Sequence, residues 1–129
     1  MISHSDGSYF FIETSFPRRP NDKARLVSSQ QTAGTSCLSF YYNMYGQNVG
    51  ALNVYVKRGV ALGNPVFSQS GTKGQDWKSA LVTITSAVQY QLVIEGVVGG
   101  GYLGDIAVDD ITMTTGTCQT SKYLINRLS

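Results

Sequence analysis

The stretch that most constrains the fold is residues 102–118, which read YLGDIAVDDITMTTGTC. Ile106 and Val108 lie two positions apart, and Ile111 and Met113 repeat that spacing with the opposite parity. Side chains on a β-strand alternate between its two faces, so this change of phase requires one extra residue between the pairs. The sequence therefore predicts a long strand with a β-bulge at residues 109–110.

Two adjacent carboxylates, Asp109 and Asp110, occupy the predicted bulge. Carboxylates in an apolar strand are costly unless a cation, backbone N–H groups or water satisfies them. One candidate is a calcium ion held by Asp109 or Asp110, with Asp6 or a carbonyl near His4 and Ser5 as a further ligand. From the residues alone, hydrogen bonds that cap the bulge are the favoured interpretation.

The rest of the chain is rich in Tyr, Thr, Ser, Val and Gly, which is typical of all-β proteins with many turns. Residues 51–57 alternate cleanly, with Leu52, Val54 and Val56 predicted to face inward. About eight short strands at even spacing favour a single domain with a two-sheet antiparallel β-sandwich. The other predicted strands are residues 9–14, 24–31, 37–45, 66–69, 77–85 and 90–96.

In residues 90–96, Tyr90, Leu92 and Ile94 are predicted to share one face of a strand, and Gln91, Val93 and Glu95 to share the other.

Five aromatic residues could line a sugar-binding platform, although aromatic residues in sandwiches more often belong to the core or to interfaces. The core is the prediction for Trp77, and Tyr55 is left open between the two. The five are Tyr41, Tyr42, Tyr55, Trp77 and Tyr102.

Charge and composition exclude several classes of function. A net charge of +2 with no basic run beyond Arg18 and Arg19 argues against a nucleic-acid partner. No apolar run reaches the roughly 18–20 residues that span a bilayer, so direct membrane insertion is not expected. His4 is the only histidine, and Asp109 and Asp110 should point to opposite faces of a strand, so no catalytic site is expected.

The two cysteines, Cys37 and Cys118, begin a central strand and end the last one. A bridge between them would close a loop of about 80 residues and stabilise the fold by roughly 4 kcal/mol. The residues alone do not decide between a disulfide and two buried thiols in a reducing compartment.

The order of the motifs resembles the MAM domain, a module shared by meprins, neuropilins and receptor tyrosine phosphatases. GSYFFIETS, CLSFYYNMYG, GALNVYV, GQDWKSALVTI, YQLVIEG, GDIAVDDI and GTC follow one another over almost the whole chain. The resemblance implies a jelly-roll-like β-sandwich outside the cell, in a secreted protein or in the ectodomain of a membrane-anchored one. It also implies adhesion or oligomerisation rather than catalysis. The implied partner is a protein, and a second copy of this domain is one such partner.

The resemblance further implies that Cys37 and Cys118 form a disulfide, and that Asp109 or Asp110 binds a cation such as calcium. Other members begin with a further segment that carries two more cysteines. We therefore expect an N-terminally truncated MAM-like domain at residues 1–118, followed by a tail or linker at 119–129. The alternative function is a carbohydrate-binding module, because jelly rolls also serve lectins. A fragment without activity of its own is a third interpretation.

Overall fold

The computed structural model describes residues 10–12, 23–46, 49–97, 99 and 104–119. These residues form eight β-strands joined by turns and loops, with no helix among them. The strands are β1 (Phe10–Ile12), β2 (Lys23–Ser28), β3 (Gly34–Gly46), β4 (Ala51–Lys57), β5 (Phe67–Ser70), β6 (Lys78–Ser86), β7 (Gln91–Val97) and β8 (Gly104–Thr115).

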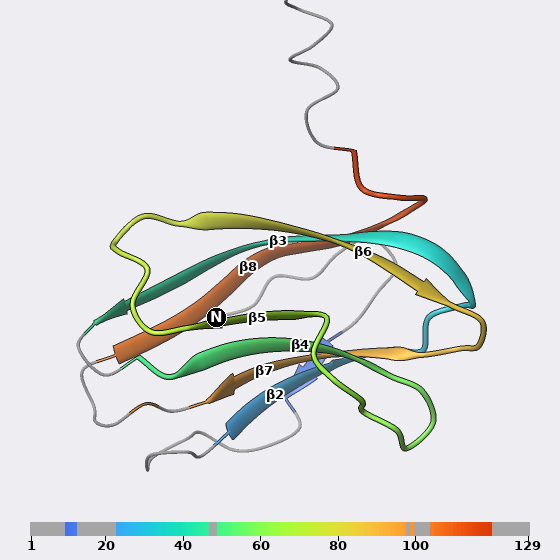
Figure 1. Ribbon diagram of the computed structural model, residues 1–129, viewed down its shortest axis with the longest axis horizontal. Coiled ribbons are helices and arrows are strands. Elements are labelled where there is room, and N and C mark those ends of the chain that lie inside the picture. The colour runs from blue at the N-terminus through green and yellow to red at the C-terminus, as the bar shows by residue number, and fades with distance from the viewer. Residues whose placement is uncertain (1–9, 13–22, 47–48, 98, 100–103, 120–129) are drawn as a thin grey trace, which may run out of the picture.

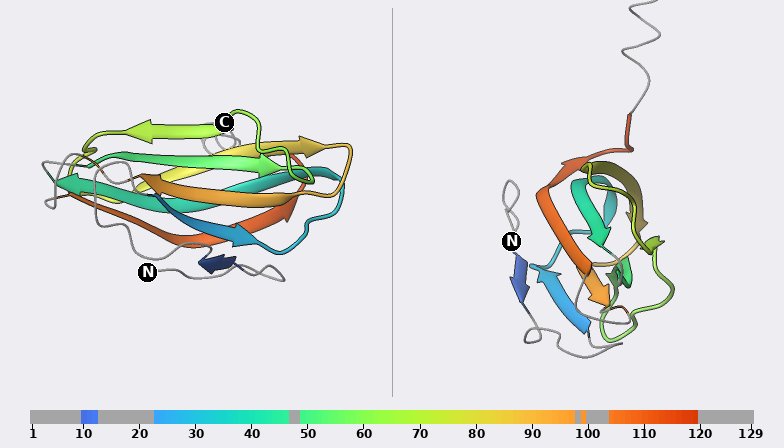
Figure 2. Two further views of the ribbon diagram at one scale, coloured as in Figure 1. Left: turned by 90° about the horizontal axis from the view of Figure 1, so that it is seen from below. Right: turned by 90° about the vertical axis from the view of Figure 1, so that its left-hand side faces the viewer.

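The strands form two layers, which Figure 1 shows one above the other. One sheet has five strands in the order β1-β2-β7-β4-β5, and the other has three in the order β6-β3-β8. Every pair of neighbouring strands is antiparallel. Figure 2 shows the same two layers from below and end-on. The predicted all-β, two-sheet antiparallel jelly-roll-like sandwich is confirmed.

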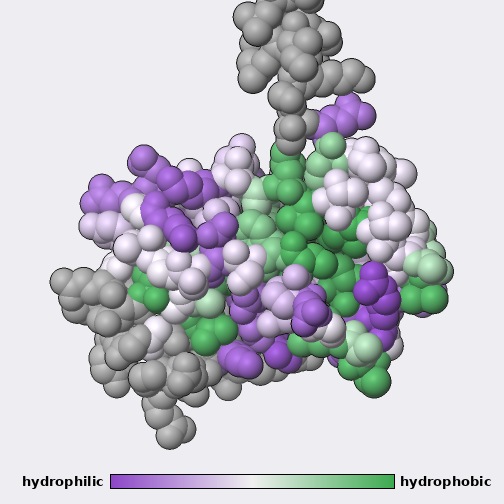
Figure 3. All heavy atoms as spheres, in the orientation of Figure 1, coloured by the Kyte–Doolittle hydropathy of each residue, from purple (hydrophilic) through white to green (hydrophobic). Residues whose placement is uncertain are grey.

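The core fills the space between the sheets. Phe40 and Tyr42 from β3 meet the ring of Phe67 from β5 edge-on, with ring centroids 5.3 and 5.5 Å apart. Where the edges of the two sheets face the viewer, Figure 3 shows apolar surface gathered between β6 and the strands β4 and β5. The fully enclosed side chains (under 2% exposed) that face this space include Leu38, Phe40, Met44, Leu52, Val54, Tyr90, Leu92 and Ile111.

Strand β4 confirms the predicted alternation, because Leu52, Val54 and Val56 are buried in the core. Strand β7 shows the predicted alternation of two sets of side chains, and both of its faces are buried. Leu92 and Ile94 face the core, and Val93 and Glu95 on the opposite face are also buried, at 2% and 1% exposure. Alternation in a strand shows which side chains share a face, and not whether that face is covered.

The predicted β-bulge is confirmed in β8. The register against β3 shifts between the pairs Ser39–Thr112 and Tyr41–Asp109, so one residue of β3 faces two residues of β8. Val108 and Ile111 are both buried although their positions differ in parity. Strand β3 lies between β6 and β8, as expected for a central strand, and holds the bulge in the middle of the sheet.

Candidate interaction site

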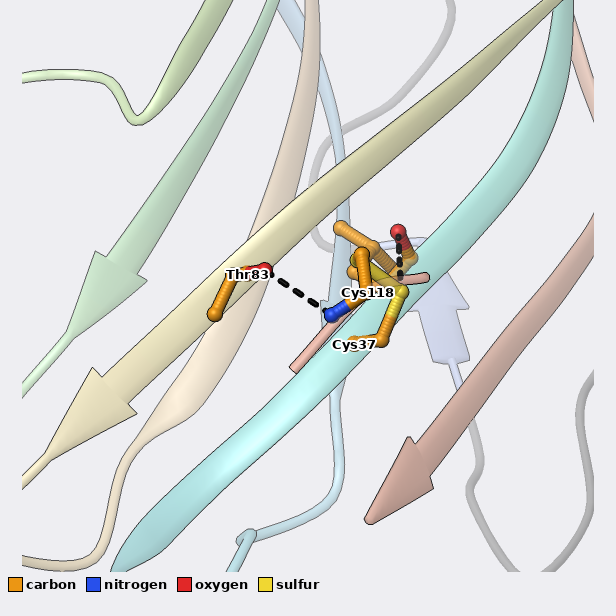
Figure 4. The surroundings of a disulfide bond; sticks show 4 residues. Cys37, Thr83 and Cys118 are labelled. Atoms are coloured by element: carbon orange, nitrogen blue, oxygen red, sulfur yellow. Dashed lines mark hydrogen bonds between the residues drawn. A yellow bond between two sulfur atoms is a disulfide. The ribbon is translucent and has the colours of Figure 1, made fainter. Parts of the chain in front are cut away.

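A disulfide joins Cys37 of β3 to Cys118, three residues beyond the end of β8. The Cα atoms are 4.8 Å apart, and the bridge closes a sequence separation of 81 residues. The backbone N–H of Cys118 donates a hydrogen bond of 3.0 Å to Oγ1 of Thr83 on β6, as Figure 4 shows. The C-terminal end of the described chain is therefore tied across the outer face of the three-stranded sheet.

The same face carries a shallow depression of about 330 Å³, which we call the acidic–aromatic depression. It is lined by Tyr41 of β3, by Trp77 immediately before β6, and by Asp109 and Asp110 of β8. All three strands of the sheet therefore meet around it, because Tyr41 is paired with Ser79 on one side and with Asp109 on the other.

The bulge explains why both carboxylates lie at this depression. Asp110 has a positive φ of 53°, a backbone conformation that aspartate tolerates better than most residues. Its N–H donates a hydrogen bond of 2.8 Å to Oδ1 of Asp109, so the carboxylate of Asp109 caps the bulge. The expectation that Asp109 and Asp110 point to opposite faces was wrong, because strict alternation does not hold across a bulge.

Trp77 lies on the surface, with 50% of its area exposed, and not in the core as predicted. It directly precedes β6 and has the parity of the exposed residues Ser79 and Leu81, so it lies on the outer face of the sheet and not between the two sheets. The loop before it is tied to β3, because Asn43 donates a hydrogen bond of 2.8 Å to the carbonyl of Gln75. The amide of Gln75 in turn donates to the hydroxyl of Tyr45 at 3.1 Å.

Large apolar side chains gather on this outer face of the sheet. Tyr41 and Tyr45 alternate with buried residues of β3, and Leu81 alternates with buried residues of β6. We call the set of Tyr41, Tyr45, Trp77 and Leu81 the apolar face; each of the four is 45–50% exposed. Of the other predicted aromatic residues, Tyr42 is in the core, Tyr55 is half-buried on the other sheet, and Tyr102 lies outside the described residues.

A second polar cluster lies on the outer face of the five-stranded sheet, around the buried carboxylate of Glu95. Arg25 of β2 forms an ion pair with Glu95 at 2.8 Å. Two residues of β4 donate hydrogen bonds to the same carboxylate. The side-chain amide of Asn53 donates at 3.2 Å, and the hydroxyl of Tyr55 donates at 3.3 Å. Sequence reasoning placed Glu95 on one face with Gln91 and Val93 and assigned it no role; the one available signal was a lone acid within the apolar strand YQLVIEG.

The surroundings of Glu95 shift two pKa values. Burial alone would raise the pKa of Glu95, but hydrogen bonds from Arg25 and Asn53 and the positive charges of Arg25 and Lys23 lower it below its ordinary value. The pKa of Tyr55 is raised, mainly by burial and then by the negative charge and hydrogen bond of Glu95. Glu95 therefore stays ionised in the folded state at neutral pH.

Calcium binding by Asp109 or Asp110 stays a prediction. In the described part of the chain no three His, Cys, Asp or Glu side chains come together as a metal site would require. The other proposed ligand sources, Asp6 and the backbone near His4 and Ser5, lie outside the described residues.

Comparison with known proteins decides the family. The family model described as MAM domain, meprin/A5/mu, matches residues 2–119. The chain belongs to the MAM domain family. This MAM domain is 48% identical over 118 residues to human MAM domain-containing glycosylphosphatidylinositol anchor protein 1, a match that covers 88% of the chain. It is 43% identical to human anchor protein 2 and 37% identical to neuropilin-1 of Xenopus laevis over 82% of the chain.

One solved structure supports the fold alone. The K3 adhesin domain of Lys-gingipain from Porphyromonas gingivalis superposes with a TM-score of 0.59 at 17% identity, covering 84% of this chain and 71% of that one.

The relatives also bear on where the domain works. The chain spans only 12–13% of the length of the anchor proteins and of neuropilin-1. The predicted localisation, extracellular or in the ectodomain of a membrane protein, is confirmed by these relatives. In the described residues, no helix has the length and apolar character needed to cross a bilayer.

Proposed function

We propose that this MAM domain is a non-catalytic extracellular module that mediates adhesion or oligomerisation through protein–protein contacts, including contacts between copies of itself. The observation that carries the proposal is the apolar face, where four large side chains lie half-exposed on one side of a three-stranded sheet. Exposed apolar patches of this kind mark interaction sites, and Trp and Tyr supply much of the binding energy at interfaces.

The proposal that the module is non-catalytic is supported by the small number of side chains that could act as a nucleophile or a general base. Both cysteines of the chain are bonded to each other, so neither is a thiol nucleophile. The single histidine of the sequence leaves few partners for a nucleophile that needs a general base.

Sedimentation velocity over a range of protein concentrations tests the contact between copies. We expect the wild-type domain to self-associate and the double variant Trp77→Ser/Leu81→Ser to remain monomeric. The matched control is Val60→Ser/Val88→Ser, which removes two exposed apolar side chains that lie in turns. A wild-type domain that stays monomeric up to millimolar concentration would contradict self-association.

A carbohydrate-binding module is the second candidate, and the acidic–aromatic depression is the observation in its favour. Aromatic side chains flanked by carboxylates provide both stacking and hydrogen-bonding for a sugar. Binding on a glycan array that is lost in Tyr41→Ala would support this function. Retained binding in that variant would place the sugar elsewhere.

A further inference from the structure

We infer that the free edge of β6 receives one extended segment of a protein partner, which adds a fourth strand to the three-stranded sheet. The segment has apolar side chains at alternate positions. The inference rests on the proposed protein–protein function and deepens it by naming a contact surface and the chemistry of the partner. It depends on an unprotected strand edge, on the direction of its backbone groups, and on apolar surface beside it.

Four strands lie at the edges of the two described sheets, and β6 lacks the usual protection of such strands against further pairing. Natural edges are protected by short length, proline, charges or a bulge. Strands β1 and β5 have three and four residues, β5 closely follows Pro65, and β8 carries the bulge with its two acids. Strand β6 has nine residues, pairs with β3 residue by residue, and carries one charge, on Lys78 at its first position. An extended chain can pair with a regular edge of this kind.

The hydrogen bonds of β3 show which backbone groups of β6 point outward. Gly116 donates its N–H to the carbonyl of Thr35 at 2.9 Å, so Thr35 directs its backbone groups toward β8. Successive residues of a strand direct these groups to opposite neighbours, so Ser36 and every second residue of β3 after it face β6. Their partners in β6 are the even-numbered residues. The backbone groups of the odd-numbered residues therefore point away from β3; these residues are Ser79, Leu81, Thr83 and Thr85.

One of the outward groups already has a partner, which agrees with this direction. The guanidinium of Arg58 donates to the carbonyl of Thr85 at 3.1 Å and closes the C-terminal end of the edge. In the part of the chain that the structure describes, the outward backbone groups of Ser79, Leu81 and Thr83 have no hydrogen-bond partner. An extended chain offers donors and acceptors at the spacing of these groups.

Apolar surface lies uncovered between β6 and β5. Val66, directly before β5, is 44% exposed, and Phe67 and Val82 pack against the core while staying partly exposed. Figure 3 shows this surface on the face toward the viewer, and Figure 2 (left) shows β5, in lime green, outside β6 on the same side. A strand added beside β6 would lie over this surface, so every second side chain of the segment should be apolar.

The geometry favours a single segment over the β6 strand of a second folded domain. Two β6 strands paired antiparallel would be related by a twofold axis perpendicular to the sheet, which places both five-stranded sheets on the same side. Because β5 already lies outside β6, the two larger sheets would overlap. The contact between copies proposed above uses the outer face of the three-stranded sheet, and not this edge.

Three peptides test the inference. The first is a blocked peptide of about nine residues, the length of β6, in which valine and threonine alternate between terminal lysines. The odd-numbered residues of β6 have their side chains on the outer face, so the peptide residues that bond to them are the outward-facing threonines. N-methylation of the threonine amides should therefore weaken binding by roughly tenfold or more, whereas N-methylation of the valine amides should change it little. Fluorescence anisotropy of the labelled peptides measures the three affinities.

Two variants of one residue provide the matched control on the domain. Ser79→Pro removes an outward N–H and leaves the pairing with β3 intact, and proline is tolerated at such positions of an edge strand. It should weaken binding of the first peptide by roughly tenfold, whereas Ser79→Ala keeps the N–H and should bind as the wild type does. Thermal melts show whether both variants are folded.

Amide hydrogen exchange of the wild type decides the question without any variant. In the free domain the amides of Leu81 and Thr83 should exchange fast, and those of Ala80 and Val82, which bond to β3, should exchange slowly. Saturating peptide should slow exchange at Leu81 and Thr83 by at least about tenfold. Unchanged exchange at these two residues, or equal binding of the three peptides, would overturn the inference. Self-association of the wild type that is lost in Ser79→Pro would overturn it in favour of pairing between copies.

These results are separable from those on the proposed function. A domain that is monomeric in sedimentation but binds the peptide retains the edge site and loses only the contact between copies. A domain that self-associates through the apolar face but does not bind the peptide retains the proposed function and loses the inference.

Discussion

Among single residues, Glu95 is expected to control how stability depends on pH. Its carboxylate is 1% exposed and accepts hydrogen bonds from Arg25, Asn53 and Tyr55. Its pKa is lower in the folded state than its ordinary value of 4.5. The stabilisation from this shift is therefore present above about pH 4.5 and is lost as the pH falls through the lowered value. Glu95→Gln should lose about 1–3 kcal/mol of stability at pH 7.

Denaturant unfolding measured from pH 7 downward checks this prediction. Below about pH 4.5 the wild type should lose stability faster than Glu95→Gln, so the two curves should converge. Asp76→Asn, which removes an exposed carboxylate, is the control and should follow the wild type. Parallel curves for the wild type and Glu95→Gln would show that Glu95 does not contribute to the pH dependence.

Among the elements, strand β3 and the chain beyond β8 depend on the disulfide between Cys37 and Cys118. Reduction should lower the free energy of unfolding by about 4 kcal/mol, because the bridge closes a loop with a sequence separation of 81 residues. For a domain of this size the midpoint of thermal unfolding should fall by roughly 12–20 °C. The measurement is a thermal melt of the oxidised protein with and without reductant.

The variant Cys118→Ser is the control for this melt. It should unfold at the midpoint of the reduced wild type and should not respond to reductant. An oxidised wild type whose midpoint is unchanged by reductant would contradict the stabilising role of the bridge.

For the whole molecule, we expect calcium to change stability little. Calcium takes six to eight oxygen ligands, and where the family's Asp-His-Thr motif has an aspartate this sequence has Ser3, in Ser3-His4-Ser5, so one source of carboxylate oxygen is replaced. The midpoint of thermal unfolding should therefore differ by less than about 2 °C between calcium and a chelator, since weak binding adds little to stability. A large stabilisation by calcium that disappears in Asp109→Asn or Asp110→Asn would refute this expectation and support a calcium site.

Several features of the molecule could be predicted from the sequence because they follow from local periodicity. The alternation in β4 placed Leu52, Val54 and Val56 in the core. The change of phase between Val108 and Ile111 indicated the bulge in β8. Such patterns are visible in one strand alone, because the backbone geometry of a strand fixes which side chains share a face.

The sites depended on tertiary structure, because burial and contact involve residues far apart in the chain. Trp77 is exposed because it lies on the outer face of the three-stranded sheet with Leu81. Glu95 is buried because β2 and β4 bring Arg25 and Asn53 to its carboxylate. Asp109 and Asp110 could be located on a bulge from the sequence. Only the pairing of β3 with both β8 and β6 placed them beside Tyr41 and Trp77. The sequence by itself determined the family, the strands and their inward faces. The folded sheets decided which of the remaining side chains are exposed and which are buried, because that depends on what covers each outer face.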